Sequence, residues 1–149
     1  GTYYVQAAQI LGQPLIITPP DGTVTTASFV ASLSAGALTT AILVVNNIRD
    51  IETDREAGKR TLAVMIGYTA SRVEYTALLV LAYLVPVWFW LQPRFNIVVL
   101  LPVLSLPYAA LVARTVWKEK SGEPLNKALE QTGKLLTLYS VLFGIGMIA

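Results

Sequence analysis

The sequence predicts an all-α protein whose helices cross a membrane several times, forming a polytopic transmembrane bundle. Of the 149 residues, 54% are hydrophobic and only 13% are charged, and the mean hydropathy is +0.59. Soluble domains carry charges at roughly a quarter of their positions. Backbone groups in lipid must find hydrogen bonds within the protein, and the apolar stretches lack the strict alternation of barrel strands, so helices are favoured.

Four stretches are expected as membrane spans, near residues 22–48, 72–92, 95–116 and 133–149. The first three contain charge-free runs of 27, 19 and 19 residues. These lengths match the roughly 20 residues that a helix needs to cross the hydrocarbon core. The connection over residues 49–71 is expected as an aspartate-rich loop between the first and second spans.

The lysines and arginines predict how the spans are oriented. None occurs in residues 1–21, five lie between the first two charge-free runs, one lies between the second and third, and five follow the third. Basic residues are enriched in cytoplasmic connections. The two five-charge connections, including the aspartate-rich loop, are therefore expected on the cytoplasmic side, with the C-terminus outside.

The composition excludes several kinds of chemistry. The chain has no cysteine and no histidine, which excludes disulfides, zinc sites of the usual type, an imidazole base and a thiol nucleophile. Any metal is expected to be a hard ion with oxygen ligands. The net charge of +2 is too small to indicate a nucleic-acid partner.

Four of the nine acidic residues follow the first span within seven positions: Asp50, Glu52, Asp54 and Glu56. If the helix of that span continues to Ala57, then Asn46, Asp50 and Asp54 stack on one face, about 5–6 Å apart. A divalent cation would relieve the repulsion between the two carboxylates. Mg²⁺ takes one or two carboxylates and completes its shell with water and phosphate oxygens. The two aspartates are therefore candidate metal ligands and candidate catalytic residues, and the amide oxygen of Asn46 could orient a ligand or accept from a bound water.

Basic residues lie directly beside this acidic cluster. Gly58 suits a helix end, and Lys59 and Arg60 follow where cations complement the helix dipole. Both are candidate diphosphate contacts, since cations stabilise the charge that develops on a departing diphosphate. Arg49 lies roughly 100° around the helix from Asp50. It is a further diphosphate candidate, expected to brace the cluster or to meet the other loop. The alternative interpretation is a solvated loop of mixed charge beside a membrane.

The spacing of these residues resembles that of a known family. Residues 46–64 have the pattern NNxRDxxxDxxxGKxTLAV, which is similar to the second aspartate-rich motif of the UbiA superfamily of membrane prenyltransferases. The pattern looks most like the branch that prenylates 1,4-dihydroxy-2-naphthoate, the MenA type of menaquinone and phylloquinone synthesis. Residues 129–146, with the pattern LExTxxLxxxYxxLxGxG, resemble the last helix of that family and are less specific. The resemblance covers most of the chain.

This resemblance implies a fold of about nine spans around a central cavity, in a bacterial inner membrane or a cyanobacterial thylakoid membrane. It implies Mg²⁺ as cofactor, an isoprenyl or phytyl diphosphate as donor and dihydroxynaphthoate as acceptor, with the ring carboxylate lost as CO₂. Carried over by position, Asn46, Asp50 and Asp54 are metal-site residues, and Lys59 and Arg60 are diphosphate contacts.

The family also carries a first aspartate motif in its N-terminal half, and the sequence has no counterpart to it. The remaining acidic residues form no aspartate pair; they are Asp21, Glu74, Glu119, Glu123 and Glu130. We therefore expect residues 1–149 to be the C-terminal half of the fold, holding half of the metal site, with the N-terminal half as partner. On this expectation the chain alone binds diphosphate weakly and does not catalyse prenyl transfer.

Other functions stay open from the residues alone. A different acceptor within the superfamily, such as hydroxybenzoate, homogentisate or a tetrapyrrole, would be distinguished by product analysis. A transporter or channel subunit would use Asp50 and Asp54 as a cation-attracting vestibule and predicts ion conductance. Against it, no other predicted span shows the buried ionisable residue that a conduction pathway usually carries. A structural membrane scaffold would leave the pair Asn46 and Asn47 without a reason.

Overall fold

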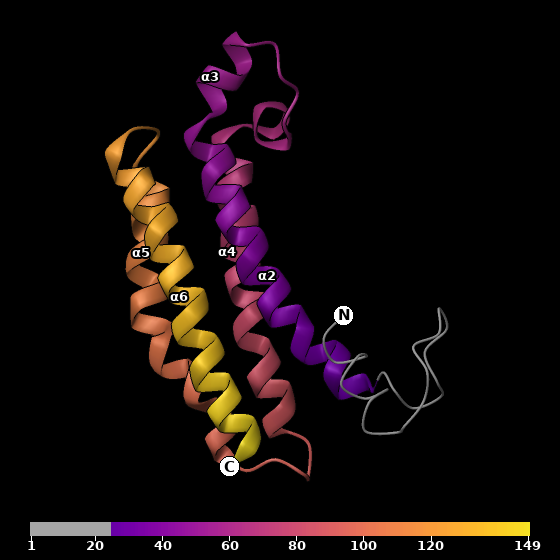
Figure 1. The fold of residues 1–149 in the computed structure, drawn as a ribbon. Helices are drawn as coiled ribbons and strands as arrows, with labels where there is room; N and C mark the ends of the chain where they lie inside the picture. The colour runs from indigo at the N-terminus through magenta and orange to yellow at the C-terminus, as the bar shows by residue number, and fades with distance from the viewer. Residues whose placement is uncertain (1–24) are drawn as a thin grey trace, which may run out of the picture.

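The computed structural model describes residues 25–149, and among these residues it contains helices and no strand, which confirms the predicted fold class. The main elements are α2 (Thr26–Arg49), α3 (Ile51–Glu56), α4 (Leu62–Trp90), the 3₁₀-helix η1 (Ile97–Ser105), α5 (Leu106–Lys118) and α6 (Glu123–Ile148). The long helices lie side by side (Figure 1). Helix α3 and the α5–α6 connection share one end of the bundle, and the C-terminus lies at the other.

Three helical segments are long and apolar enough to cross a membrane: Thr26–Arg49, Leu62–Trp90 and Ile97–Lys118. They correspond to the first three predicted spans, although the predicted start near residue 22 lies outside the described residues. The fourth predicted span, residues 133–149, forms the second half of α6. Helix α6 is not among the three because charged and polar side chains occupy its first half.

The connection predicted over residues 49–71 is shorter in the structure. Helix α4 begins at Leu62, where the Thr61 hydroxyl accepts a hydrogen bond from the Val64 amide at 3.4 Å. A residue inside α4, Gly67, has φ 77° and ψ 177°, so the helix kinks there after its first turns. The predicted boundary came too late because the charges of Arg72 and Glu74 lie directly before the uncharged run.

Arg72 corrects the expectation that the remaining spans bury no ionisable residue. Its side chain is only 9% exposed within α4. The guanidinium donates to the carbonyl of Val116 at 3.0 Å and to that of Glu119 at 2.6 Å. These carbonyls belong to the end of α5, where unpaired acceptors and the helix dipole both favour a cation. The carbonyls at the end of α5 therefore accept the hydrogen bonds of Arg72 and compensate its charge. These contacts do not indicate an ion pathway.

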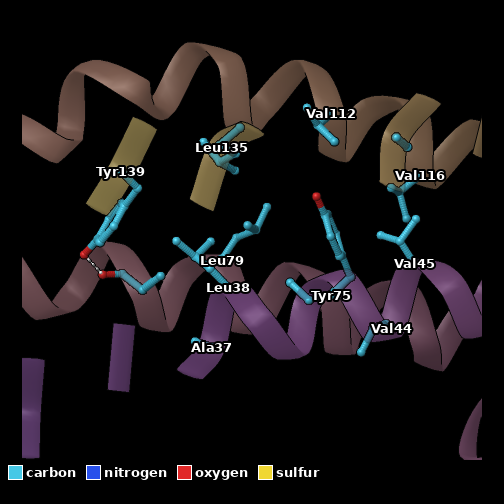
Figure 2. Packing of buried hydrophobic residues seen from close by; sticks show 14 of the residues in the cluster. Ala37, Leu38, Val44, Val45, Tyr75, Leu79, Val112, Val116, Leu135 and Tyr139 are labelled. Carbon is cyan, nitrogen blue, oxygen red and sulfur yellow. Dashed lines mark hydrogen bonds between the residues drawn. The ribbon is translucent and has the colours of Figure 1, made fainter. Parts of the chain in front are cut away.

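Apolar side chains from α2, α4, α5 and α6 meet in one core (Figure 2). Two buried tyrosines cross it with their hydroxyls paired. Tyr139 on α6 donates to the carbonyl of Ala82 on α4 at 2.7 Å, and Tyr75 on α4 pairs with Thr132 on α6 at 3.1 Å. Because a bilayer offers no water to an unpaired hydroxyl, these bonds join α4 to α6 in a defined register.

Candidate functional site

The site predicted from the sequence forms the end of the bundle at which α2 stops. We call residues 46–60 the aspartate segment. Helix α2 ends at Arg49, and Asp50 leaves helical geometry with φ −97° and ψ 6° before α3 begins. The continuous helix that we expected up to Ala57 is therefore interrupted at Asp50. The i to i+4 spacing survives, because the Asp50 amide donates to the Asn46 carbonyl at 3.2 Å and the Asp54 amide donates to the Asp50 carbonyl at 2.8 Å.

Arg49 lies at the centre of this segment. Its Nε and Nη2 donate to the two carboxylate oxygens of Asp50, both at 2.7 Å. Nη2 also donates to the Oδ1 of Asn46 at 2.9 Å, and Nη1 donates to the Oδ1 of Asn126 at 3.0 Å. The break at Asp50 lets the carboxylate turn toward Arg49, which a straight helix would hold about 100° away. Arg49 thus braces the cluster and also contacts Asn126 on α6.

The second aspartate is held by a different cation. Asp54 is buried at 7% exposure, and its Oδ1 accepts from Lys59 Nζ at 2.9 Å. The chain returns toward Asp54 through Gly58, whose φ of +70° is a conformation that glycine adopts without strain. The Lys59 amide then donates to the Asp54 carbonyl at 2.8 Å. Arg60 is exposed and makes no side-chain hydrogen bond or ion pair within residues 25–149.

These contacts determine the charge state of the site. The hydrogen bonds from Arg49 hold the pKa of the Asp50 carboxyl below its usual 3.8, and the charge of Lys59 acts in the same direction. The hydrogen bond to Asp54, with the charges of both aspartates, raises the pKa of Lys59. The Asp50 carboxylate is therefore ionised at neutral pH, and Arg49 and Lys59 remain charged.

Two contacts of the segment had no signal in the local sequence. Asn126 is 77 positions from Arg49, so no spacing rule connects the two residues. The hydroxyl of Tyr68 on α4 donates to a carboxylate oxygen of Glu52 on α3 at 3.3 Å. The guanidinium of Arg72 lies over the Tyr68 ring, 5.5 Å from its centroid. Tyr68 therefore links the outer face of α3 to the first turns of α4.

The oxygen donors of the segment suit a hard divalent cation. The carboxylates of Asp50 and Asp54 and the amide oxygen of Asn46 are the ligand types that Mg²⁺ takes, and its remaining positions go to water and phosphate oxygens. In the part of the chain that the structure describes, no three acidic side chains come close enough to enclose a metal by themselves. The residues fit a metal that a ligand or further residues help to bind.

The comparisons with known proteins identify the family of the chain. The family model described as the UbiA prenyltransferase family matches residues 2–141. The 1,4-dihydroxy-2-naphthoate octaprenyltransferase of Haemophilus influenzae is 33% identical over 148 residues, covering 99% of this chain and 44% of the relative. The enzyme of the same name from Escherichia coli is 31% identical over 147 residues, covering 99% of this chain and 43% of the relative.

The human UbiA prenyltransferase domain-containing protein 1 is 40% identical over 110 residues, or 74% of this chain and 31% of the relative. No solved structure gives a significant match. The chain spans less than half the length of these curated relatives. The similarity to the two naphthoate prenyltransferases confirms the resemblance seen in the aspartate segment, and the chain belongs to the UbiA prenyltransferase family.

Proposed function

We propose that the chain takes part in the transfer of an isoprenyl or phytyl group from its diphosphate to 1,4-dihydroxy-2-naphthoate, with Mg²⁺ as cofactor. The observation that carries the proposal is the pairing of two aspartates with cations at one end of an apolar helix bundle, Asp50 with Arg49 and Asp54 with Lys59. A lipid diphosphate has the matching shape, with a hydrocarbon tail for the bundle and a charged head for its end. The acceptor is taken from the two naphthoate prenyltransferases that match almost the whole chain.

Each residue of the segment has a role in this proposal. Asp50, Asp54 and Asn46 would hold Mg²⁺, which when bound shields the diphosphate charge and makes it a better leaving group. Lys59 and Arg60 would contact the diphosphate and stabilise the charge that it gains on departure. Lys59 can leave Asp54 for this purpose, since its side chain is 65% exposed. Arg49 has one N–H left after its four hydrogen bonds within the described residues, so it contributes mainly to the position of the ligands.

The relatives are more than twice as long as the chain, and the proposed site needs further ligands. We propose that an N-terminal half carrying the first aspartate motif supplies them, with both halves enclosing one cavity in the membrane. The aspartate segment would then lie on the cytoplasmic side, as the distribution of basic residues predicts. Water would be kept from the reacting group by the apolar walls of the cavity.

Substitution of the two aspartates tests the proposal in the complete enzyme. Asp50→Asn and Asp54→Asn keep the size of the side chain and remove its charge, and each should lower turnover by several orders of magnitude at saturating Mg²⁺. Glu56→Ala is the matched control, because Glu56 is exposed on the same short helix. Product analysis by mass spectrometry identifies the acceptor. Near-normal turnover of both asparagine variants would remove the metal assignment.

A further inference from the structure

We infer that Asn126, in the first turn of α6, is a positioning residue for the aspartate segment and acts through Arg49. Arg49 Nη1 donates to Asn126 Oδ1 at 3.0 Å, which joins residues 77 positions apart. Among the described residues, it is the only side-chain hydrogen bond that joins the aspartate segment to α6. The role of Asn126 toward the metal rests on the proposed function, whereas the contact itself does not.

Arginine chemistry determines how the two amides are turned. A guanidinium has five N–H donors and no acceptor, so an amide that bonds it must present its oxygen. Both Asn46 and Asn126 therefore direct Oδ1 toward Arg49, and their NH₂ groups face elsewhere. With two bonds to Asp50 as well, four of the five donors are engaged. The guanidinium plane is consequently held from three sides.

The segment requires such an anchor because its own helix does not continue through it. Asp50 has left helical geometry, so the helix backbone no longer dictates the direction of its carboxylate. Arg49 supplies that direction, and Arg49 is in turn tied to α6. The start of α6 is a firm support, since Leu125 and Ala128 on either side of Asn126 are fully buried. The positions of the Asp50 and Asn46 oxygen ligands therefore depend partly on α6, a helix that is distant in the sequence.

Loss of the Asn126 amide oxygen should loosen the segment without unfolding the bundle. Arg49 would keep its two bonds to Asp50, but the pair could swing together, and Asn46 would lose a defined partner. Groups that orient metal ligands typically account for about 10–100-fold in metal affinity. Because Asn126 is exposed, we expect a value near the lower end, about tenfold.

Spin labels test directly whether the Arg49–Asn126 contact holds the aspartate segment against α6. The sequence has no cysteine, so the labels attach only to the cysteines that are introduced. Labels at Glu56 and Ser121, both exposed, report the distance between α3 and the α5–α6 connection in the 149-residue chain in lipid. Asn126→Ala should broaden the distance distribution. Asn126→Gln retains an amide oxygen and should restore a narrow one. Gln131→Ala, an amide on the same helix, is the matched control and should leave the distribution unchanged.

The positioning role is tested with Mn²⁺, a paramagnetic ion that takes the same oxygen ligands as Mg²⁺. Binding to the complete enzyme, followed by electron paramagnetic resonance, should be about tenfold weaker in Asn126→Ala and close to wild type in Asn126→Gln and Gln131→Ala. Equal Mn²⁺ affinity in all four forms of the complete enzyme would overturn the positioning role. If none of the four forms binds Mn²⁺, the metal site of the proposed function fails, and the positioning role fails with it. Identical distance distributions in wild type and Asn126→Ala would overturn the inference that the Arg49–Asn126 contact holds the aspartate segment against α6.

Discussion

Gly146 is the glycine of the described residues at which an added methyl group would meet the closest contacts. Helix α6 packs so closely on η1 there that a Cβ would lie 2.7 Å from the carbonyl oxygen of Val98 and 2.8 Å from the Cα of Val99. Both obstacles are backbone atoms, which cannot rotate away as a side chain can. To reach ordinary contact at about 3.4 Å or more, the two helices must separate by more than half an ångström along this line.

The cost of Gly146→Ala is the balance of two terms. Overpacking of a well-packed interior costs about 1–3 kcal/mol, and alanine regains about 0.5–1 kcal/mol over glycine within a helix. Gly144 lies two residues earlier on α6 with nothing within 4 Å of its added Cβ. Gly144→Ala should therefore show only the gain in helix stability. The difference in the free energy of unfolding between the two variants then gives the cost of the steric clash, about 1–3 kcal/mol.

The measurement is the free energy of unfolding of the 149-residue chain in mixed micelles, obtained by denaturing-detergent titration. Tryptophan fluorescence reports the transition, because Trp88 and Phe89 lie near the same end of the core, where Phe89 also contacts Phe143 of α6. Gly146→Ala should unfold at lower detergent fraction than wild type, and Gly144→Ala at an equal or higher one. Equal stabilities of the two alanine variants would refute the close approach of α6 and η1.

Two further predictions concern burial and topology. Arg72→Ala leaves two carbonyls at the end of α5 without their donor. It should lower the free energy of unfolding by about 2–3 kcal/mol, measured by the same titration. Arg114 is an exposed arginine on α5, so Arg114→Ala should change this free energy little. Single cysteines at Thr53 and Ser121 should react with a membrane-impermeant thiol reagent from the cytoplasmic side, and one at Asn96 only from the opposite side; labelling of Thr53 and Asn96 from one side would contradict the proposed orientation.

The membrane character of the protein and the place of the aspartate segment directly after the first span could be predicted from the sequence. Both depend on patterns that are local in the chain. A charge-free run of about 20 residues dictates a helix in lipid wherever it occurs, because its backbone has no other partner. In the same way, the spacing from Asn46 to Asp54 keeps three oxygen-bearing side chains within two helical turns, and the interruption at Asp50 did not separate them along the backbone.

The partners of those side chains could not be predicted, because they depend on which helices become neighbours. The boundary of α4 was placed too late since the charge of Arg72 looks like the end of a span, and only the packed α5 shows where that charge is compensated. Arg49 was expected on another face, and it turned to Asp50 once the helix ended there.

Asn126 gave no sign of its role, for it becomes a partner of Arg49 only after α6 packs against α2. The sequence by itself determined an apolar helical bundle with an aspartate cluster at one end, because helix formation in lipid and i to i+4 spacing are short-range effects. The surroundings of the Asp50 carboxylate were decided by the tertiary structure, because the guanidinium that binds Asp50 and Asn46 also binds Asn126 on a helix that is distant in the sequence.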